Sequence, residues 1–374
     1  MIQNILFITD IHFGIPQTDR LCQELYKNFI PFLEQNDIDV LFFGGDYFHT
    51  KLSLYENNSF KAFKFFVDMM AIAKKKNIKV RFIEGTSSHE RFQPRMLENM
   101  VNDVDYKIYE NVGDETINGM KVLYIPEEYP MNINEYYSEY KNNQYDLIIS
   151  HATWDFINFA KSIDNNRNDM HTAPVFKYNE WKHSLDHGVC LSGHIHGRHV
   201  FKNKYGTKII YPGSFTSWNF DQISERGFLY GSIDTEKHTF QYKFINNPDA
   251  PKYANLDICD LGLDLNNVDI DVIKACIEKE KEKVDFIKVN IDKLPVEKKL
   301  IVKELFKNNS EITTDITTTD VLTENANKSY IKYEYLLKDN LSIEEAIKRF
   351  IKEEFGEDLD VKVIKDVIKL DSST

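Results

Sequence analysis

The chain has 374 residues, which is long enough for two or three domains of ordinary size. Hydrophobic residues make up 42% and aromatic residues 13% of it, so a disordered or collagen-like chain is excluded. The formal net charge of −13 argues against a general nucleic-acid coating protein, because such proteins neutralise phosphates with lysine and arginine. Any contact with DNA must therefore be local, metal-assisted or shared with a partner.

The cysteines and the first residues of the chain bear on the cellular compartment in which the protein is expected. Four cysteines show no C-x-x-C spacing, so neither a disulfide framework nor a thiolate zinc site is indicated, and we expect a reducing cytoplasm. The start MIQNILFITD lacks a basic region and a small-residue cleavage site, and charged residues interrupt the apolar stretch 60–73. We therefore expect no export signal and no membrane span.

Short apolar runs rich in β-branched and aromatic residues recur along the first part of the chain. They lie at 5–9, 40–43, 80–83, 122–125, 147–149, 189–191 and 208–211. Their nearly continuous hydrophobicity is typical of strands buried on both faces. Helical periods separate the early ones, at Leu21, Leu25, Phe29 and Leu33 and then at Phe60, Phe63, Val67 and Met70. The pattern predicts a layered α/β sandwich.

The composition changes after about residue 239. Turn-forming residues at 246–252 precede a stretch richer in Lys, Glu, Asp and Ile, with a predicted strand at 286–291, a helix at 296–307 and an edge strand or loop at 313–320. Beyond 325, Ser342 and Glu345 form a capping-box pattern that opens an apolar helical stripe at 343–351. We predict three domains at 1–240, 241–325 and 326–374, the second a small α+β domain and the third helical.

Polar residues follow these predicted strands where each strand ends. The set consists of Asp10, His12, Asp46, His49, Ser88, His89, His151, His194 and His196. The carboxyl ends of strands in open α/β sheets form ligand sites, so we expect these side chains to converge. Any one histidine alone is more often an ordinary solvated residue, but six of the eleven histidines occupy such positions. Mixed imidazole and carboxylate ligands suit divalent transition metals, so the sequence predicts a metal site.

Together these motifs resemble the calcineurin-like metallophosphoesterases. The chain carries D-x-H at 10–12, G-D at 45–46, a lone His151, G-H-x-H at 193–196, and Y-P-G-S at 211–214 like the closing turn of the family. It has S-H-E at 88–90, where the family usually has N-H followed by D or E. The resemblance implies a β-sandwich flanked by helices, followed by a small α+β capping domain and C-terminal helices.

The resemblance also assigns roles to the residues. It implies one metal held by Asp10, His12 and His196, a second held by His151 and His194, and Asp46 bridging them. The two divalent ions, expected to be Mn²⁺, would activate a water that attacks phosphorus. Ser88 stands where the family's asparagine binds the second metal, so we expect a weaker second site or one completed by water.

By the same resemblance, His89 would bind the phosphate or protonate the leaving alkoxide, and His49 would orient it. A purely structural role for both histidines stays open. Within the family, the run GGDYFH at 44–49 resembles the SbcD-type DNA nuclease subunits, including those of phages, in which a histidine stands three residues after the bridging aspartate.

The expected function is therefore a DNA nuclease, exonuclease and/or endonuclease, in an SbcCD-type repair or recombination complex. Its partners would be DNA, an SbcC-type coiled-coil ATPase and a second copy of the chain, in the cytoplasm of a cell or of a viral host. The stripe at 343–351 would dock on the ATPase or pack on its own second domain. The alternatives are a phosphoesterase for small phosphodiesters, nucleotides or phosphoproteins, and an inactive scaffold of the same fold.

Two surface features have competing interpretations. The basic run at 74–81 could contact the DNA backbone, although lysines also collect at helix C-termini, where they complement the dipole. The tyrosine-rich stretch 127–145 could stack on unpaired bases, although half-buried surface tyrosines are the more common case. Neither feature decides the function.

Overall fold

The computed structural model describes residues 1–53, 55–90, 92–97, 103–157, 175–220, 225–315 and 352. These residues belong to two compact units. The first comprises Met1–Ala254 and Glu280–Ile287, and the second comprises Asn255–Lys279 and, within the described part, 288–315 and 352. The domain boundaries at 240 and 325 stay predictions, and the predicted stripe at 343–351 lies outside the described residues apart from its flanking Lys352.

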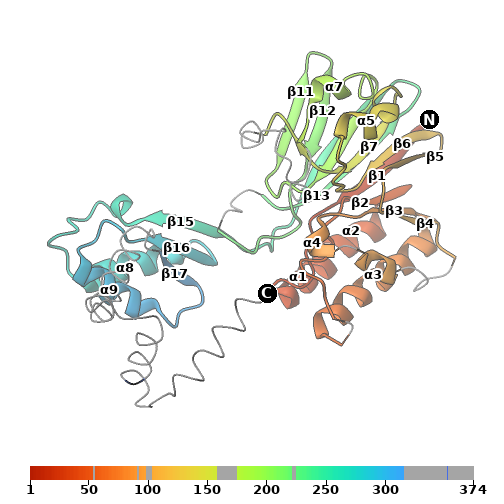
Figure 1. Ribbon diagram of the computed structural model, residues 1–374. Coiled ribbons are helices and arrows are strands. Elements are labelled where there is room, and N and C mark those ends of the chain that lie inside the picture. The colour runs from red at the N-terminus through yellow and green to blue at the C-terminus, as the bar shows by residue number, and fades with distance from the viewer. Residues whose placement is uncertain are drawn as a thin grey trace. The chain divides into compact units, whose positions relative to one another are not determined.

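Two six-stranded sheets form the first unit (Figure 1). In spatial order the first sheet consists of β14 (Thr239–Asn246), β13 (Gly227–Asp234), β1 (Ile2–Ile8), β2 (Val40–Phe43), β3 (Lys79–Ile83) and β4 (Tyr106–Tyr109). The second consists of β11 (His199–Asn203), β12 (Gly206–Tyr211), β10 (Val189–Gly193), β7 (Leu147–His151), β6 (Met120–Ile125) and β5 (Gly113–Ile117). A two-stranded ribbon pairs β8 (Thr153–Trp154) with β9 (Val175–Phe176).

The central strands of both sheets are parallel. Strands β1, β2, β3 and β4 run in the same direction, as do β12, β10, β7 and β6, and the antiparallel pairings lie toward the sheet edges. The seven runs predicted as strands correspond to β1, β2, β3, β6, β7, β10 and β12. Their carboxyl ends lie along one edge of each sheet, where the loops that carry the candidate site begin.

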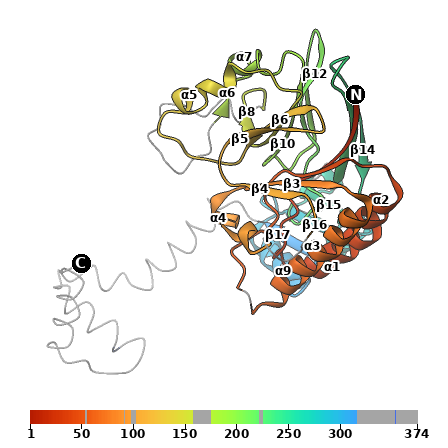
Figure 2. The same cartoon turned by 90° about the vertical axis from the view of Figure 1, so that its right-hand side faces the viewer.

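Helices cover the outer face of each sheet, and Figure 2 shows the resulting layers. The first sheet is covered by α1 (Thr18–Glu24), the π-helical turn η1 (Leu25–Phe29), α2 (Ile30–Gln35) and α3 (Asn57–Lys76). The second sheet is covered by α5 (Ile133–Tyr136), α6 (Ser138–Lys141) and α7 (Tyr178–Trp181). Two short segments, α4 (Ser87–Glu90) and the 3-10 turn η2 (Gln93–Leu97), follow β3. The α/β sandwich predicted from the sequence is confirmed.

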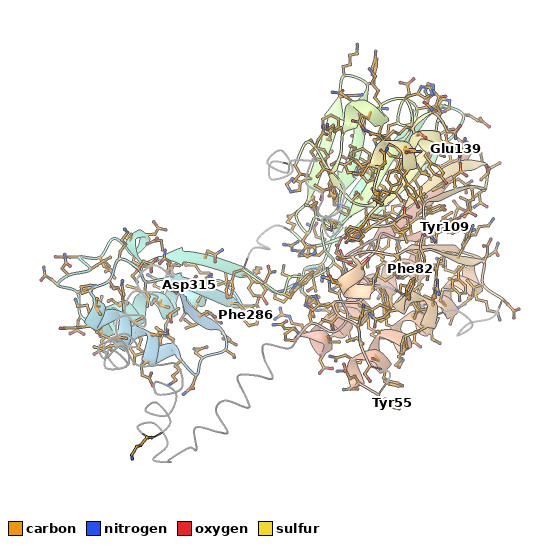
Figure 3. All side chains as sticks on the ribbon, in the orientation of Figure 1. Tyr55, Phe82, Tyr109, Glu139, Phe286 and Asp315 are labelled. Atoms are coloured by element: carbon orange, nitrogen blue, oxygen red, sulfur yellow. The ribbon has the colours of Figure 1, made fainter. Side chains whose placement is uncertain are left out.

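Alternation along the strands explains why the apolar runs are continuous. On β1, Leu6 and Ile8 pack against the helices, while Ile5 and Phe7 pack between the two sheets. Figure 3 labels Phe82 and Tyr109 on neighbouring strands; Phe82 belongs to the core under the helices and Tyr109 to the core between the sheets. Each strand therefore needs apolar side chains on both faces, which produces the unbroken hydrophobic pattern.

The basic run at 74–81 serves the fold. Lys74, Lys75 and Lys76 form the last turn of α3, and Lys76 Nζ donates to the backbone oxygens of Leu33 and Glu34 at the end of α2, at 3.0 and 2.8 Å. These contacts satisfy carbonyl groups that the end of a helix leaves without partners. The helix-end interpretation of the run is supported.

The second unit is built around the three-stranded sheet β15 (Tyr253–Asp257), β16 (Phe286–Asn290) and β17 (Ile312–Asp315), in that order. The 3-10 turn η4 (Ile258–Leu261) and the helices α8 (Ile270–Lys281) and α9 (Val296–Phe306) accompany it. Strand β16 and helix α9 match the predicted strand and helix, while α8 was not predicted. Across the described ranges of both units, no helix is both long and apolar enough to cross a membrane.

Candidate metal centre

The candidate site residues lie on loops at the carboxyl ends of the parallel strands. Asp10 and His12 follow β1, Asp46 follows β2, His151 ends β7, and His194 follows β10. Four of these five have left-handed backbone, with φ of 50° at Asp10, 60° at His12, 51° at Asp46 and 83° at His194. Such conformations cost about 1–3 kcal/mol each for residues with a Cβ, and they concentrate at functional sites.

The first cluster consists of Asp10, His12, Asp46 and His196, with one ligand atom of each within 4.8 Å of the others. His12 Nε2 lies 3.9 Å from Asp10 Oδ1, 3.7 Å from Asp46 Oδ2 and 3.1 Å from His196 Nε2. Atoms that each bind one cation at about 2.0–2.2 Å are separated by roughly 3–4 Å. The spacing and the donor types of this cluster therefore fit a divalent transition metal.

The second cluster consists of Glu127, His151 and His194. Glu127 Oε2 lies 3.7 Å from His151 Nε2 and 3.2 Å from His194 Nδ1. Asp46 Oδ2, which belongs to the first cluster, lies 3.5 Å from His151 Nε2. One carboxylate oxygen thus borders both clusters, as a bridging ligand must.

Hydrogen bonds to the second ring nitrogen fix which atom of each imidazole faces the cluster. His151 Nδ1 lies 2.7 Å from the backbone oxygen of Gly44, to which it donates, so its Nε2 is the nitrogen that faces the cluster. His49 Nδ1 lies 3.3 Å from His12 Nδ1, which leaves His12 Nε2 facing the cluster. The backbone N–H of His194 donates to Asp10 Oδ1 at 3.1 Å and so connects the two loops. Such outer contacts orient metal ligands.

Glycine is required where these loops approach one another. A Cβ on Gly193, the last residue of β10, would lie 2.1 Å from Thr9 Oγ1 and 2.3 Å from the Gly44 oxygen. Gly45 has φ of +90°, and a Cβ there would lie 2.4 Å from His151 Nδ1. The glycines of the G-D and G-H-x-H motifs therefore permit the close contact that brings the ligands together.

Burial controls the charge of the ligands. It raises the pKa of the Asp10 carboxyl to about 6, and it lowers the pKa of His12 well below its ordinary value and that of His196 to about 3. Burial also disfavours charge on Asp46 and His151, but their mutual attraction outweighs it, lowering the pKa of Asp46 and raising that of His151. His12 and His196, whose pKa values are lowered, are neutral imidazoles beside carboxylates, which is a donor set that binds a divalent metal. A bound cation would also offset the cost of burying the carboxylates together.

The comparisons with known proteins decide the family. The model of the calcineurin-like phosphoesterases matches residues 3–198, which is more than half of the chain. The chain belongs to the calcineurin-like phosphoesterase family. This family uses divalent metals in phosphoester hydrolysis, and the two clusters of this phosphoesterase are its candidate metal ligands.

Solved structures add little to this assignment. The protein TT1561 of Thermus thermophilus is 11% identical with a TM-score of 0.36, and the match covers 66% of this chain and 100% of that chain. The protein of unknown function AQ665 from Aquifex aeolicus is 17% identical with a TM-score of 0.23, covering 48% of this chain and 91% of that chain. No curated protein matches this phosphoesterase.

His49 and His89 lie beside the first cluster of the phosphoesterase and form a further group with His12. His89 Nδ1 lies 3.5 Å from Asp46 Oδ2, and the side chain is 28% exposed, so it can reach a substrate. The His49 and His89 rings lie 5.5 Å apart between centroids. Because His49 is hydrogen-bonded to His12, it is placed to orient a metal ligand rather than to contact a phosphate directly.

Ser88 and Thr86 lie differently with respect to the second cluster. Ser88 is exposed, because the short helix α4 turns its side chain outward while Glu90 of the same turn points inward. The hydroxyl that faces the second cluster belongs to Thr86, whose Oγ1 lies 3.0 Å from Glu127 Oε2 and 3.4 Å from His151 Nε2. Thr86 thus presents a hydroxyl to the second cluster, and binding of the second metal by Ser88 stays a prediction.

Sequence reasoning also missed Glu127 and Trp218. Glu127 follows β6 just as the predicted ligands follow their strands, so the same rule applied to the run 122–125 would have found it. The Trp218 ring lies 4.3 Å from that of His12 and 4.8 Å from that of His196, between centroids. Trp218 comes from a loop well after the motifs, and the sequence carries no signal that places it there.

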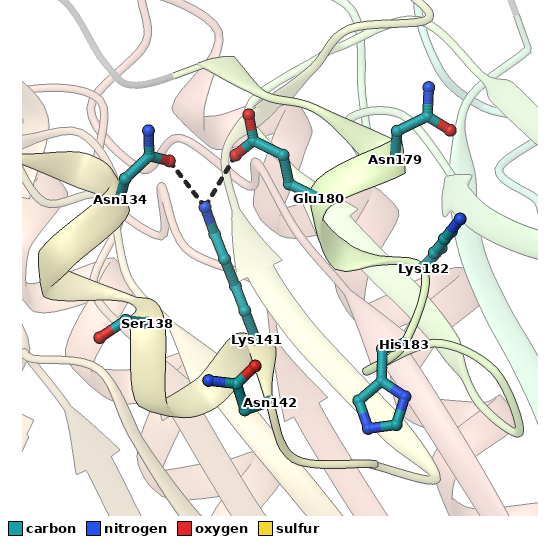
Figure 4. Close-up of a pocket in the computed structure, with 8 residues that line it drawn as sticks. All are labelled: Asn134, Ser138, Lys141, Asn142, Asn179, Glu180, Lys182 and His183. Carbon is teal, nitrogen blue, oxygen red and sulfur yellow. Dashed lines mark hydrogen bonds and ion pairs between the residues drawn. The ribbon is translucent and has the colours of Figure 1, made fainter.

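The pocket shown in Figure 4 lies elsewhere on the phosphoesterase unit. It is lined by Asn134, Ser138, Lys141, Asn142, Asn179, Glu180, Lys182 and His183. Lys141 Nζ donates to Asn134 at 2.9 Å and pairs with Glu180 at 2.8 Å, so its charge is already neutralised by groups that line the pocket. None of the site residues predicted from the sequence lines this pocket.

Proposed function

We propose that this phosphoesterase is a dimetal-dependent DNA nuclease, exonuclease and/or endonuclease, that serves as the nuclease subunit of an SbcCD-type repair or recombination complex. Asp10, His12 and His196 would hold one ion and His151 and His194 the other, with Asp46 between them. We take both ions to be Mn²⁺. When bound, such ions lower the pKa of a water and neutralise charge on the phosphoryl oxygens.

The observation that carries the proposal is the placement of His49 and His89 around the ligands His12 and Asp46. The G-D-Y-F-H run brings His49 Nδ1 to 3.3 Å from His12 Nδ1, and this run is the part of the sequence that resembles SbcD-type subunits. His89, partly exposed and next to the shared Asp46, is the group best placed to bind the phosphate or donate a proton to the leaving alkoxide. An imidazole can transfer a proton near neutral pH.

The partners follow from the same proposal. A net charge of −13 leaves little general attraction for DNA, so an SbcC-type coiled-coil ATPase would supply much of the DNA contact. We propose that the chain works as a homodimer bound to that ATPase, in the cytoplasm of a cell or of a viral host. The segment 326–374 is proposed as the ATPase-docking part.

Cleavage of defined substrates tests the function. The wild-type chain, His89→Ala and the control His183→Ala, an exposed histidine of the Figure 4 pocket, are given Mn²⁺ with duplex DNA ends, a chromogenic phosphodiester and a chromogenic phosphomonoester. We expect cleavage of DNA, a loss of about 10²–10⁴-fold in His89→Ala, and no change in His183→Ala.

Two results would contradict the proposal. Hydrolysis of the small phosphodiester without DNA cleavage, even beside the ATPase, would identify a small-molecule phosphodiesterase. A chain that binds two cations but hydrolyses none of the substrates, with or without the ATPase, would be an inactive scaffold.

A further inference from the structure

We infer that Glu127 is a direct ligand of the second cation and that Tyr129 positions it. The second site would then contain a full carboxylate of its own, in addition to two imidazoles and the shared Asp46. The inference rests on the two-cation centre of the proposed function but not on the nature of the substrate.

Glu127 is held at the end of β6, beside the end of β7 that carries His151. Its side chain is 2% exposed, and its backbone N–H donates to the backbone oxygen of Glu84 at 3.2 Å. A buried carboxylate is costly unless hydrogen bonds or a cation compensate for the lost hydration. Its position and burial therefore call for partners of opposite charge.

The two carboxylate oxygens of Glu127 have different surroundings. The Tyr129 hydroxyl donates a hydrogen bond to Oε1, which fixes the rotation of the carboxylate. Oε2 is turned to the cluster, 3.0 Å from Thr86 Oγ1, 3.2 Å from His194 Nδ1 and 3.7 Å from His151 Nε2. The tyrosine thus leaves one oxygen free to bind a cation.

Two imidazole nitrogens face Oε2 at distances that suit a shared cation. His151 donates through Nδ1 to the Gly44 oxygen, so Nε2 is the ring nitrogen that faces Oε2, 3.7 Å away. His194 Nδ1 faces the same oxygen at 3.2 Å. Together with Asp46 Oδ2, 3.5 Å from His151 Nε2, these atoms surround one point, and distances of 3.2–3.7 Å suit atoms that share one cation.

Charge balance supports the same assignment. Asp10 and Asp46 alone would leave two divalent cations with a formal surplus of about two positive charges, and Glu127 reduces that surplus to about one. Added ligand charge raises cation affinity. Glu127 would therefore strengthen the second site, which the sequence alone predicted to be weak.

Calorimetric titration with Mn²⁺ tests the assignment without any substrate. The wild-type chain is compared with Glu127→Gln, with Glu127→Asp, which keeps the charge on a shorter side chain, and with the control Glu128→Gln. Glu128 is the neighbouring residue, but it accepts hydrogen bonds from Val112, Tyr136 and Tyr137 instead of facing the cluster. Thermal unfolding without metal checks that each variant folds.

We expect the wild-type chain and Glu128→Gln to bind two Mn²⁺ ions. Glu127→Gln should bind the first normally and the second more than about 100-fold more weakly, beyond the 10–100-fold typical of groups that only orient a ligand. The affinity of Glu127→Asp for the second ion should lie between those of the wild-type chain and Glu127→Gln. Tyr129→Phe should lower the affinity for the second ion by about tenfold, because Glu127 keeps its charge but loses the hydrogen bond that orients it.

The titration can also distinguish a residue that only orients His194, because a glutamine side chain could still accept a hydrogen bond from an N–H of His194. If Glu127 only orients His194, Glu127→Gln will bind two ions with nearly wild-type affinity, and the inference is overturned. A wild-type chain that binds a single ion overturns it as well. Failure of the nuclease proposal looks different, since the titration would be as expected while DNA stayed uncut.

Discussion

The Glu90 carboxylate accepts a hydrogen bond from the backbone N–H of Asp46 at 3.0 Å. It also accepts from the backbone N–H groups of Tyr47 at 2.8 Å and Phe48 at 3.2 Å, and from that of Gly85. Glu90 therefore shapes the loop that holds Asp46 in its left-handed conformation between the two clusters. The last residue of the S-H-E motif acts on the metal centre through the backbone.

Replacing Glu90 with glutamine tests this role. Glu90→Gln is expected to lower the free energy of unfolding by about 1–3 kcal/mol, because the amide group cannot accept hydrogen bonds from all of these N–H donors. It should also lower the affinity for both cations, since Asp46 borders both clusters. Urea unfolding and Mn²⁺ titration measure the two effects. The exposed Glu56→Gln should stay within about 0.5 kcal/mol of the wild type, and equal values for the two variants would contradict the prediction.

A second prediction concerns pH and the link between the two sheets. Arg81 of β3, which is 5% exposed, donates to Glu115 of β5 and to Asp105, while Tyr124 donates to Glu115 at 2.9 Å. Burial alone would raise the pKa of Glu115, but the hydrogen bonds from Arg81 and Tyr124 lower it below its ordinary value. Because the folded-state pKa of Glu115 is lowered, the ion pair of Arg81 and Glu115 stabilises the fold fully above the unfolded pKa of about 4.3. This contribution is lost as the pH falls through the folded-state pKa.

Glu115→Gln should therefore destabilise the protein by about 1–3 kcal/mol at pH 7. The difference from the wild type should shrink once the pH falls below about 4. Urea unfolding at pH 7, 5 and 3.5 measures it, with the exposed Glu139→Gln as control. A difference that does not change with pH would show that the ionised carboxylate is not what stabilises the link.

Strands and strand-end residues were predictable from the sequence because both are local features. The runs at β1, β2 and β10 are apolar on both faces, and the residues that follow them are placed by the strand direction itself. That is why Asp10, His12, Asp46 and His194 could be expected to converge. No long-range contact has to be known for this step.

The remaining site residues depend on orientation within loops, which residue spacing does not determine. In the turn at α4, Ser88 is exposed and Glu90 is buried, and the S-H-E motif alone does not determine which of its side chains faces the site. The role of His49 depends on its hydrogen bond with His12, formed across 37 residues. Trp218 reaches the site from a loop whose path no local pattern predicts.

Variants of Thr86 and Ser88 test which hydroxyl serves the second cation. The Thr86 backbone N–H donates to Asp46 Oδ1 at 2.6 Å and its hydroxyl lies 3.0 Å from Glu127 Oε2, whereas Ser88 is exposed. Thr86→Val keeps the shape of the side chain but removes the hydroxyl, so it should lower the affinity for the second Mn²⁺ by about tenfold. Ser88→Ala should leave the affinity for both ions unchanged. A larger effect from Ser88→Ala in the titration would instead support Ser88 as the ligand.

The last prediction concerns the close approach of β10 to the loops of the first sheet. A Cβ on Gly193 would lie 2.1 Å from Thr9 Oγ1 and 2.3 Å from the Gly44 oxygen, which is backbone and cannot rotate away. Gly193→Ala must therefore push β10 away from these loops, at a cost of about 1–3 kcal/mol. Because His194 and His196 follow directly, both clusters should lose Mn²⁺ affinity together.

Gly113→Ala is the matched control, since a Cβ there would meet only Tyr109 at 3.6 Å, an ordinary contact. Urea unfolding and Mn²⁺ titration of the two alanine variants separate a general effect of losing glycine from a local one. If Gly193→Ala keeps both cations, the ligand positions do not depend on how closely the sheets approach at this point. If it loses both while Gly113→Ala loses neither, the glycine of the G-H-x-H motif acts by permitting contact between the two halves of the metal centre.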